Sequence, residues 1–391
     1  MPLDFLNLQG QAQKYAEAAA TLRQEREGKL QACQALMQEF DSNLEELRAI
    51  VVASAAQNKG LRCAVPLEEP LSTHLGVELP APACTILAAD GSQINPDPHG
   101  EELFGLVNVG VFTMKPDSGN APEVTITSNL LFDEALHPNG SLASEALIAL
   151  MRDTREREIL AKMAHAEASP VIALTDGPLE LFREPRTEQV FNNYFEKYLA
   201  ALDRLATHQV ITAGYVDRPR ADLVVKMLEL ASPNKVEQPF RGVSDLALFE
   251  PILKSGERSA VFRLQSSSAE YYSNEIESGK AGPRTLCFFY LNVGSESQPA
   301  LARVETPLRV VENQAMMELL QSVLVEQSKQ LGSRPYPYPL LRAHEIAVVK
   351  IEDHTQVLEM LQKELIRCGI MPGFTSNKQF GKQNLGRRRM R

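Results

Sequence analysis

Three apolar, strand-like runs follow one another between residues 84 and 132, separated by turn-forming residues. They cover 84–90, 103–114 and 123–132, and the segments between them contain Asn95-Pro96 and Asp117-Ser118-Gly119. A helical pattern then extends from about Ser141 to Ala166, and a fourth apolar run covers 170–182. Because a helical crossover normally joins parallel strands, we predict that the fourth strand lies parallel to the first.

The rest of the chain alternates between helical and strand-like patterns. Residues 10–57 are rich in Ala, Leu, Gln and Glu and predict helix, and a Pro-rich connector follows over 66–82. Further helices are expected near 186–206, 220–231, 312–331 and 354–369, and further strands near 208–216, 258–265, 284–293 and 300–311. This order predicts an α/β protein with a mixed sheet flanked by helices.

The predicted organisation has three parts. An N-terminal helical region with its connector covers 1–80, an α/β domain covers 81–375, and a basic tail covers 376–391. Within the α/β domain, 233–283 has mixed signals and many Ser and Glu residues, so it is a candidate inserted subdomain. The tail carries six cations after Asn377 and no acid, which fits either a solubilising end or an arm that binds phosphate or a partner.

Composition restricts the class of protein. No apolar run is long enough to span a membrane, and no secretion signal is expected at the N-terminus. The five cysteines are scattered without a CxxC pair, which favours a reducing cytoplasm and gives no zinc or disulfide framework. The net charge of −10 argues against binding of nucleic acid through an overall positive field, although the distribution of charge matters more than its total.

The chemistry is concentrated where two apolar runs end in Asp-Gly. Asp90 follows "CTILAA" and Asp176 follows "PVIALT". A turn explains either one alone. If the two strands are parallel neighbours, however, both carboxylates emerge at the carboxyl edge of the sheet, where they repel each other unless a cation or a proton intervenes. Mg²⁺ or Mn²⁺ fits, because hard cations prefer oxygen ligands.

Further candidates lie on the intervening helix and near the C-terminus. Glu156 and Glu158 are the acidic residues expected to supply a third ligand, although either one can also belong to a salt-bridged surface. The stiff segment "RPYPYP" precedes Arg342 and His344. His344 is therefore either a structural residue, or a metal ligand or proton donor.

Taken in order, the segments "LAADGSQ", "IALTDGPLELF", "ITAGYVDRPRADLVVKML", "LARVETPLRVV" and "YPYPLLRAHEIAV" resemble the NurA family of nucleases over about residues 84–365. The resemblance implies an RNase H-like fold and a DNA nuclease that depends on Mn²⁺ or Mg²⁺. It also implies a homodimer that works with HerA, a hexameric DNA-translocating ATPase, to resect DNA ends in double-strand break repair. By the same resemblance, digestion runs 5′ to 3′, with endonuclease activity on single-stranded DNA as a further expectation.

Carried over by motif, the resemblance assigns roles to individual residues. Asp90 and Asp176 are the strand-borne metal ligands, Glu156 is the helical ligand with Glu158 as its alternative, and His344 is a catalytic histidine that also serves as a ligand. Tyr336 is the aromatic residue of the same late segment. The acidic net charge suggests that DNA is held locally, by groups such as Arg218, Arg220 and Arg342, which can equally form surface salt bridges.

Two other functions fit the same residues. One is a catalytically inactive adaptor subunit of a DNA translocase, and the other is a metal-dependent phosphatase that uses the same carboxylates. The sequence contains no GxxxxGK[ST] loop, so ATP hydrolysis is expected from a partner.

Overall fold

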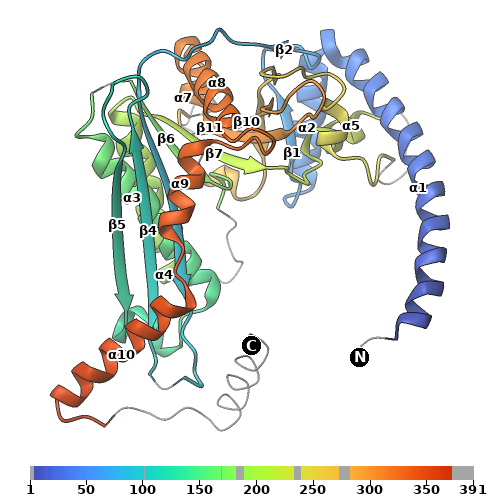
Figure 1. Ribbon diagram of the computed structural model, residues 1–391. Coiled ribbons are helices and arrows are strands. Elements are labelled where there is room, and N and C mark those ends of the chain that lie inside the picture. The colour runs from blue at the N-terminus through green and yellow to red at the C-terminus, as the bar shows by residue number, and fades with distance from the viewer. Residues whose placement is uncertain are drawn as a thin grey trace. The chain divides into compact units, whose positions relative to one another are not determined.

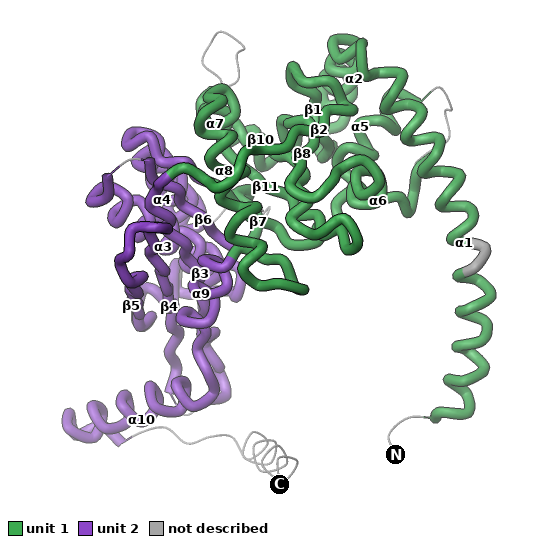
Figure 2. The backbone as a smooth tube through the Cα atoms, turned by 45° about the horizontal axis from the view of Figure 1, so that its top comes forward, with its two compact units in different colours: residues 1–82, 177–182, 213–337 green, residues 83–176, 183–212, 338–391 purple. Residues whose placement is uncertain are grey.

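A computed structural model gives the fold of the chain, and it describes residues 4–100, 102–168, 170–181, 189–232, 239–272 and 282–371 (Figure 1). The chain forms two compact units (Figure 2). Unit 1 comprises residues 1–82, 177–182 and 213–337, and unit 2 comprises 83–176, 183–212 and 338–391. The basic tail predicted for 376–391 lies outside the described residues.

Unit 1 is built on antiparallel strands in the order β1-β9-β10-β11-β7, with β8 pairing with β10 and β2. The strands are β1 (Cys63–Pro66), β2 (His74–Leu75), β7 (Ile211–Asp217, in unit 1 from residue 213), β8 (Arg258–Ser259), β9 (Phe262–Gln265), β10 (Leu286–Asn292) and β11 (Leu301–Pro307). The helices are α1 (Phe5–Glu39), α2 (Leu44–Gln57), α5 (Leu223–Ala231), α6 (Asp245–Phe249), α7 (Leu308–Val311) and α8 (Gln314–Lys329).

The core of unit 1 forms around β10 and β11, which are buried along their whole length; β10 is apolar up to Asn292, whereas β11 also buries Arg303 and Glu305, which pair with each other. Rings from β9, β10 and α6 pack together there, with Phe262 stacked on Phe288 and Phe249 stacked on Tyr290. Strand β9 lies in the 233–283 stretch and pairs with both β1 and β10, so this stretch supplies strands to the sheet of unit 1.

Unit 2 contains a mixed sheet in the order β6-β3-β4-β5. Its strands are β3 (Thr85–Ile94), β4 (Gly105–Met114), β5 (Glu123–Leu131) and β6 (Val171–Asp176), and its helices are α3 (Glu145–Ala164), α4 (Gln189–Thr207), α9 (Tyr338–Ala347) and α10 (Ile351–Arg367). The first three strands are antiparallel, and β6 is parallel to β3. The predicted parallel pairing of the first and fourth strands is confirmed, as is the α/β class.

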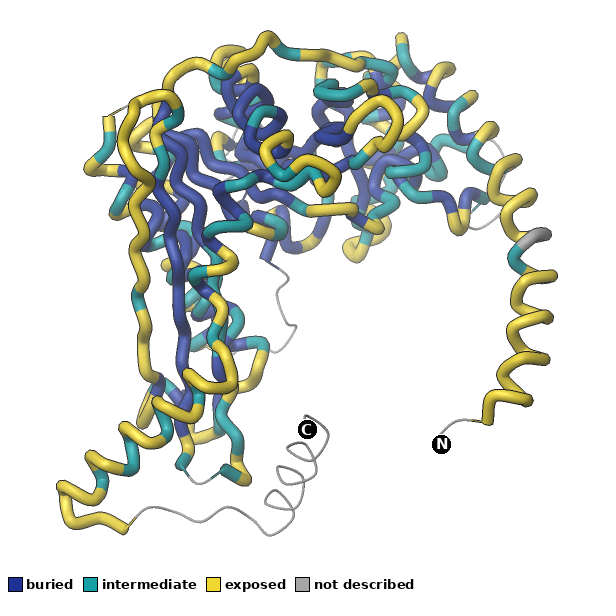
Figure 3. Tube along the Cα trace, in the orientation of Figure 1, coloured by how far each residue is buried: buried dark blue, intermediate teal, exposed yellow. Residues whose placement is uncertain are grey.

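Helices α3 and α9 cover opposite faces of this sheet. Gly91 on β3 contacts α3, whereas Gly110 on β4 contacts α9. Gly110 is paired with Asp90, and paired residues of adjacent strands point to the same face, so Gly91 points to the other face. The strands between the two helices are buried and appear dark blue in Figure 3, while β5 is exposed along most of its length.

One local prediction is wrong. Asp90 does not end its strand: β3 continues to Ile94, because β4 pairs with it throughout this stretch. The Pro-Tyr-Pro-Tyr-Pro segment leads into α9, which begins within it at Tyr338 and carries both Arg342 and His344. All five cysteines are free thiols in this structure. Within the described chain, no helix is both long enough and apolar enough to cross a membrane.

Candidate nuclease site

The two strand-borne aspartates occupy neighbouring positions on parallel strands. The last paired residues of β3 and β6 are Ala89 and Thr175, so Asp90 and Asp176 are the next residues along each strand. Parallel strands lie about 4.8 Å apart, and residues in register point to the same face of the sheet. Strand β6 ends at Asp176 while β3 continues, so the two carboxylates lie where β3 loses its parallel neighbour.

His344 approaches this position from α9. Its Nδ1 lies 2.7 Å from Oδ2 of Asp90, while Oδ1 of Asp90 accepts a hydrogen bond from the backbone N–H of Gly91 at 2.8 Å. The Asp90 side chain is 18% exposed and the imidazole is 56% exposed. The ring is therefore held through Nδ1 and open to solvent on its other side.

Small and polar residues position α9 against the sheet. A Cβ added to Gly110 would lie 3.2 Å from the carbonyl oxygen of Ala343, so the helix backbone packs directly on the strand. At the end of α9, the carbonyl oxygen of Ala347 accepts hydrogen bonds from Oγ of Ser92 at 2.5 Å and from Nδ2 of Asn108 at 2.8 Å. These bonds satisfy a terminal helix carbonyl and fix the position of His344.

Glu156 reaches β3 from the other face. It is buried, and its Oε1 lies 2.6 Å from where a Cβ of residue 91 would be, so a side chain at that position would require Glu156 or Arg152 to shift. Burial raises the pKa of Glu156 well above its ordinary value, and the charges of Asp153 and Asp90 raise it further, against the opposing effect of Arg157 and Arg152.

Glu158 differs from Glu156 in its surroundings. Its carboxylate pairs with Nη1 of Arg155 at 3.3 Å, and its side chain is partly exposed. Positions two apart on a helix point in widely different directions. Of the two alternatives, the one adjacent to β3 is Glu156.

Arg152 is a residue near the site that sequence reasoning did not identify. Its aliphatic stem packs on Gly91, and its Nε lies 3.7 Å from Oε1 of Glu156. Burial opposes the charge of the guanidinium, but the carboxylates of Asp153, Glu156 and Asp90 raise its pKa. The glycine inside "LAADGSQ" was the available signal, because a glycine within a strand often marks a close approach by another element.

The remaining predicted residues lie in different surroundings. Arg342 forms an ion pair with Glu345 on α9. Tyr336 belongs to unit 1, where its ring packs edge to face on Tyr215 at 5.4 Å between centroids. Arg218 and Arg220 are exposed in unit 1, just beyond β7.

The donor chemistry fits a hard divalent cation. Asp90, Asp176 and Glu156 offer carboxylate oxygens, and His344 offers an imidazole nitrogen. Over the described part of the chain, the His, Cys, Asp and Glu side chains form no ready-made group of three or more that could hold a metal ion. His344 meets Asp90 on the α9 face of the sheet, whereas Glu156 reaches β3 from the α3 face.

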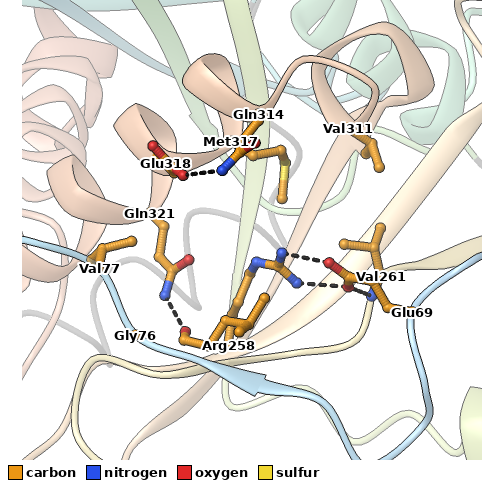
Figure 4. A pocket seen from close by; sticks show the side chains of 11 residues that line it. Glu69, Gly76, Val77, Arg258, Val261, Val311, Gln314, Met317, Glu318 and Gln321 are labelled. Carbon is orange, nitrogen blue, oxygen red and sulfur yellow. Dashed lines mark hydrogen bonds and ion pairs between the residues drawn. The ribbon is translucent and has the colours of Figure 1, made fainter.

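A separate pocket of about 420 Å³ lies in unit 1 and contains none of the predicted site residues (Figure 4). Its central charges are already paired, since Arg258 donates two hydrogen bonds to Glu69. Gln321 at its edge donates to the backbone carbonyls of Leu75 and Gly256. Glu318, also in the lining, accepts a hydrogen bond from Nε2 of Gln314 at 2.7 Å.

The strand order and acidic edge of unit 2 are those of an RNase H-like nuclease. The family model "NurA domain" matches residues 84–349. The chain belongs to the NurA family. Among solved structures, it is similar to the NurA nuclease from Sulfolobus solfataricus, with a TM-score of 0.51 and 11% identity over 84% of this chain and 97% of that one.

Two endonuclease V structures are also similar. The enzyme from Ciona intestinalis gives a TM-score of 0.32 and 11% identity, covering 83% of this chain and 98% of that one. The catalytic domain of human endonuclease V gives a TM-score of 0.32 and 13% identity, covering 82% of this chain and 98% of that one. No curated protein matches the sequence.

The packing of α9 at Gly110 gives a direct test of how His344 is positioned. We expect Gly110→Ala to reduce nuclease activity by roughly 10-fold or more, because the new methyl would lie 2.6 Å from Cγ1 of Ile346 and 3.0 Å from the backbone nitrogen of Ala347, which forces the helix outward. Steady-state cleavage measures the loss of activity, and thermal unfolding shows whether the fold is also less stable. Gly28→Ala is the matched control, because nothing lies within 4 Å of its added Cβ. Full activity in Gly110→Ala would show that α9 does not need this contact.

Proposed function

We propose that this protein is a divalent-metal-dependent deoxyribonuclease whose catalytic residues are Asp90, Glu156, Asp176 and His344. The observation that carries the proposal is the placement of Asp90 beside Asp176 on parallel strands, with His344 at 2.7 Å from Asp90. Membership of the NurA family supports a nuclease with a DNA substrate.

Asp90, Asp176 and Glu156 would hold the cation, which is Mn²⁺ or Mg²⁺. When bound, it would supply Lewis-acid stabilisation of the charge that develops on phosphate oxygens. The buried carboxylate of Glu156 has a raised pKa because burial disfavours its charge, and a cation would favour the ionised form.

His344 acts on protons. With Nδ1 directed at the Asp90 carboxylate, the ring is held in one orientation and its other nitrogen, Nε2, is left for substrate. From this position it would donate a proton to the departing 3′ oxygen or serve as a ligand. By motif alone, Tyr336, eight positions before His344, is also proposed as a catalytic residue. Arg218, Arg220 and Arg342 are the proposed local contacts to the DNA backbone, each of them partly or fully exposed.

The biological setting follows from the family. We propose that the protein acts in the cytoplasm as a homodimer with a HerA-type hexameric ATPase, resecting DNA ends in double-strand break repair. Digestion from 5′ to 3′, together with endonuclease activity on single-stranded DNA, is part of the same proposal. The absence of a phosphate-binding GxxxxGK[ST] loop supports a partner as the source of ATP hydrolysis.

The direct test is degradation of 5′-labelled linear duplex and single-stranded DNA by the full chain with Mn²⁺, with Mg²⁺ or with EDTA. We expect degradation with either metal and none with EDTA. A small phosphate monoester is the parallel substrate: its hydrolysis in place of DNA cleavage would indicate a phosphatase. If neither substrate is cleaved while a HerA-type ATPase still binds, the protein is an inactive adaptor.

A further inference from the structure

Two histidines from different helices meet at the end of the α3–α4 pair. His165 is the residue that caps α3 at its C-terminus, and His208 directly follows α4. Their Nδ1 atoms lie 3.5 Å apart, and their ring centroids are separated by 4.4 Å. Both imidazoles are exposed and neither belongs to the proposed nuclease site.

The meeting point is fixed by contacts along the two helices. Thr154 donates a hydrogen bond to the backbone carbonyl of Tyr194 at 3.3 Å, and Arg157 donates to the hydroxyl of Tyr198 at 3.3 Å. Going from Thr154 to Arg157 to His165 on the α3 side, the contacted residue on the α4 side also moves toward the C-terminus, ending at His208. The helices therefore run parallel, and their C-terminal ends converge at the two rings.

Two converging helix C-termini favour a cation. Each helix end carries a partial negative charge from its last backbone carbonyls, so parallel helices place two such ends together. The nearby carboxylate of Glu167 is paired with Lys115 at 2.8 Å. The two imidazoles lie at this end, where the last turns of the helices also carry Lys162 and Arg204.

The separation of the nitrogens matches metal coordination. Two imidazole nitrogens bound to one tetrahedral Zn²⁺, at about 2.0–2.1 Å each, lie about 3.4 Å apart. Imidazole suits Zn²⁺, Cu²⁺ and Ni²⁺, whereas the proposed catalytic carboxylates suit hard cations such as Mg²⁺ and Mn²⁺. We infer that His165 and His208 form a second, non-catalytic site for a transition-metal ion such as Zn²⁺, with water completing its coordination.

A metal ion bound by both histidines would link the C-terminal ends of α3 and α4. Glu156 lies nine residues before His165 on the same helical segment, about 14 Å along the axis. The ion would therefore be separate from the nuclease centre, but it would stabilise the position of α3, the helix that carries Glu156.

The test uses the full chain, freed of metal with a chelator and carrying His344→Ala so that the nuclease site loses its histidine. Zn²⁺ alone is titrated by calorimetry, and thermal unfolding is followed with and without it. We expect one Zn²⁺ bound and a rise in Tm of about 2–4 °C. Both effects should be lost when His165→Ala or His208→Ala is added, and kept when the exposed His99→Ala is added as the matched control.

Two results would overturn the inference. One is the absence of Zn²⁺ binding in the His344→Ala protein. The other is Zn²⁺ binding with the same stoichiometry and the same Tm rise after His208→Ala, because the ion would then be held elsewhere. Neither result depends on nuclease activity, so the nuclease proposal stands or falls separately.

Discussion

Asp90→Asn and Asp176→Asn are each expected to lower metal-dependent DNA cleavage by roughly 10³-fold or more, with the fold intact. Each change keeps the size of the side chain but removes the charge that a divalent cation needs. The two carboxylates lie next to each other on β3 and β6, and the proposed site uses the charge of both. Cleavage of 5′-labelled linear DNA in Mn²⁺ and circular dichroism measure activity and folding.

The double variant adds information on how the aspartates work. If the two residues act as one cation-binding unit, Asp90→Asn with Asp176→Asn should be no less active than the worse single variant, because the unit is already lost. Asp133→Asn is the matched control: this aspartate is exposed in unit 2 and has a φ of 52°, a conformation that Asn tolerates. Metal-dependent cleavage that survives Asp176→Asn would exclude the proposed site.

Glu156→Gln is expected to have opposite effects on activity and stability. Cleavage should fall by roughly 10²-fold or more, since a carboxylate ligand becomes a neutral amide. The metal-free protein, however, should become more stable at neutral and alkaline pH. Burial raises the pKa of Glu156, and glutamine removes the cost of ionising a buried group.

The pH dependence of this effect has a defined sign. A carboxyl group whose pKa is higher in the folded state than in the unfolded state contributes stability that is fully present below its unfolded pKa. That contribution is lost as pH rises through the folded pKa, so wild type should lose stability relative to Glu156→Gln across this window. Thermal unfolding in EDTA over a pH series measures the difference.

Glu158→Gln is the matched control for Glu156→Gln. It lies on the same helix but pairs with Arg155 and is partly exposed, so its removal should change cleavage less than about 2-fold. The assignment of the helical ligand would be reversed if Glu158→Gln abolished cleavage while Glu156→Gln left it unchanged.

Several features could be predicted because they depend on local pattern. The apolar runs predict the strands of unit 2 and their order along the chain, since apolar runs and turn residues act over short distances. The parallel placement of β6 followed from the helix that precedes it. With that placement, the sequence predicts that Asp90 and Asp176 are neighbours.

Other features depend on contacts between residues far apart in sequence. The continuation of β3 past Asp90 results from its pairing with β4 through Ile94 and Leu106. The helix at His344 begins within the Pro-Tyr-Pro segment, because α9 packs on a face of β4 that Gly110 leaves open. Neither outcome has a local signal, since each is set by the surface that the segment meets.

The sequence by itself determined the α/β class, the placement of Asp90 and Asp176 on parallel strands, and the family resemblance. All three follow from residue order and short-range periodicity. Tertiary structure decided that Glu156 lies against Gly91, that Arg152 lies beside it, and that His165 meets His208. These choices depend on helix rotation and on which helices pack together. Their physical basis is complementarity between distant surfaces, which the order of residues along one segment does not contain.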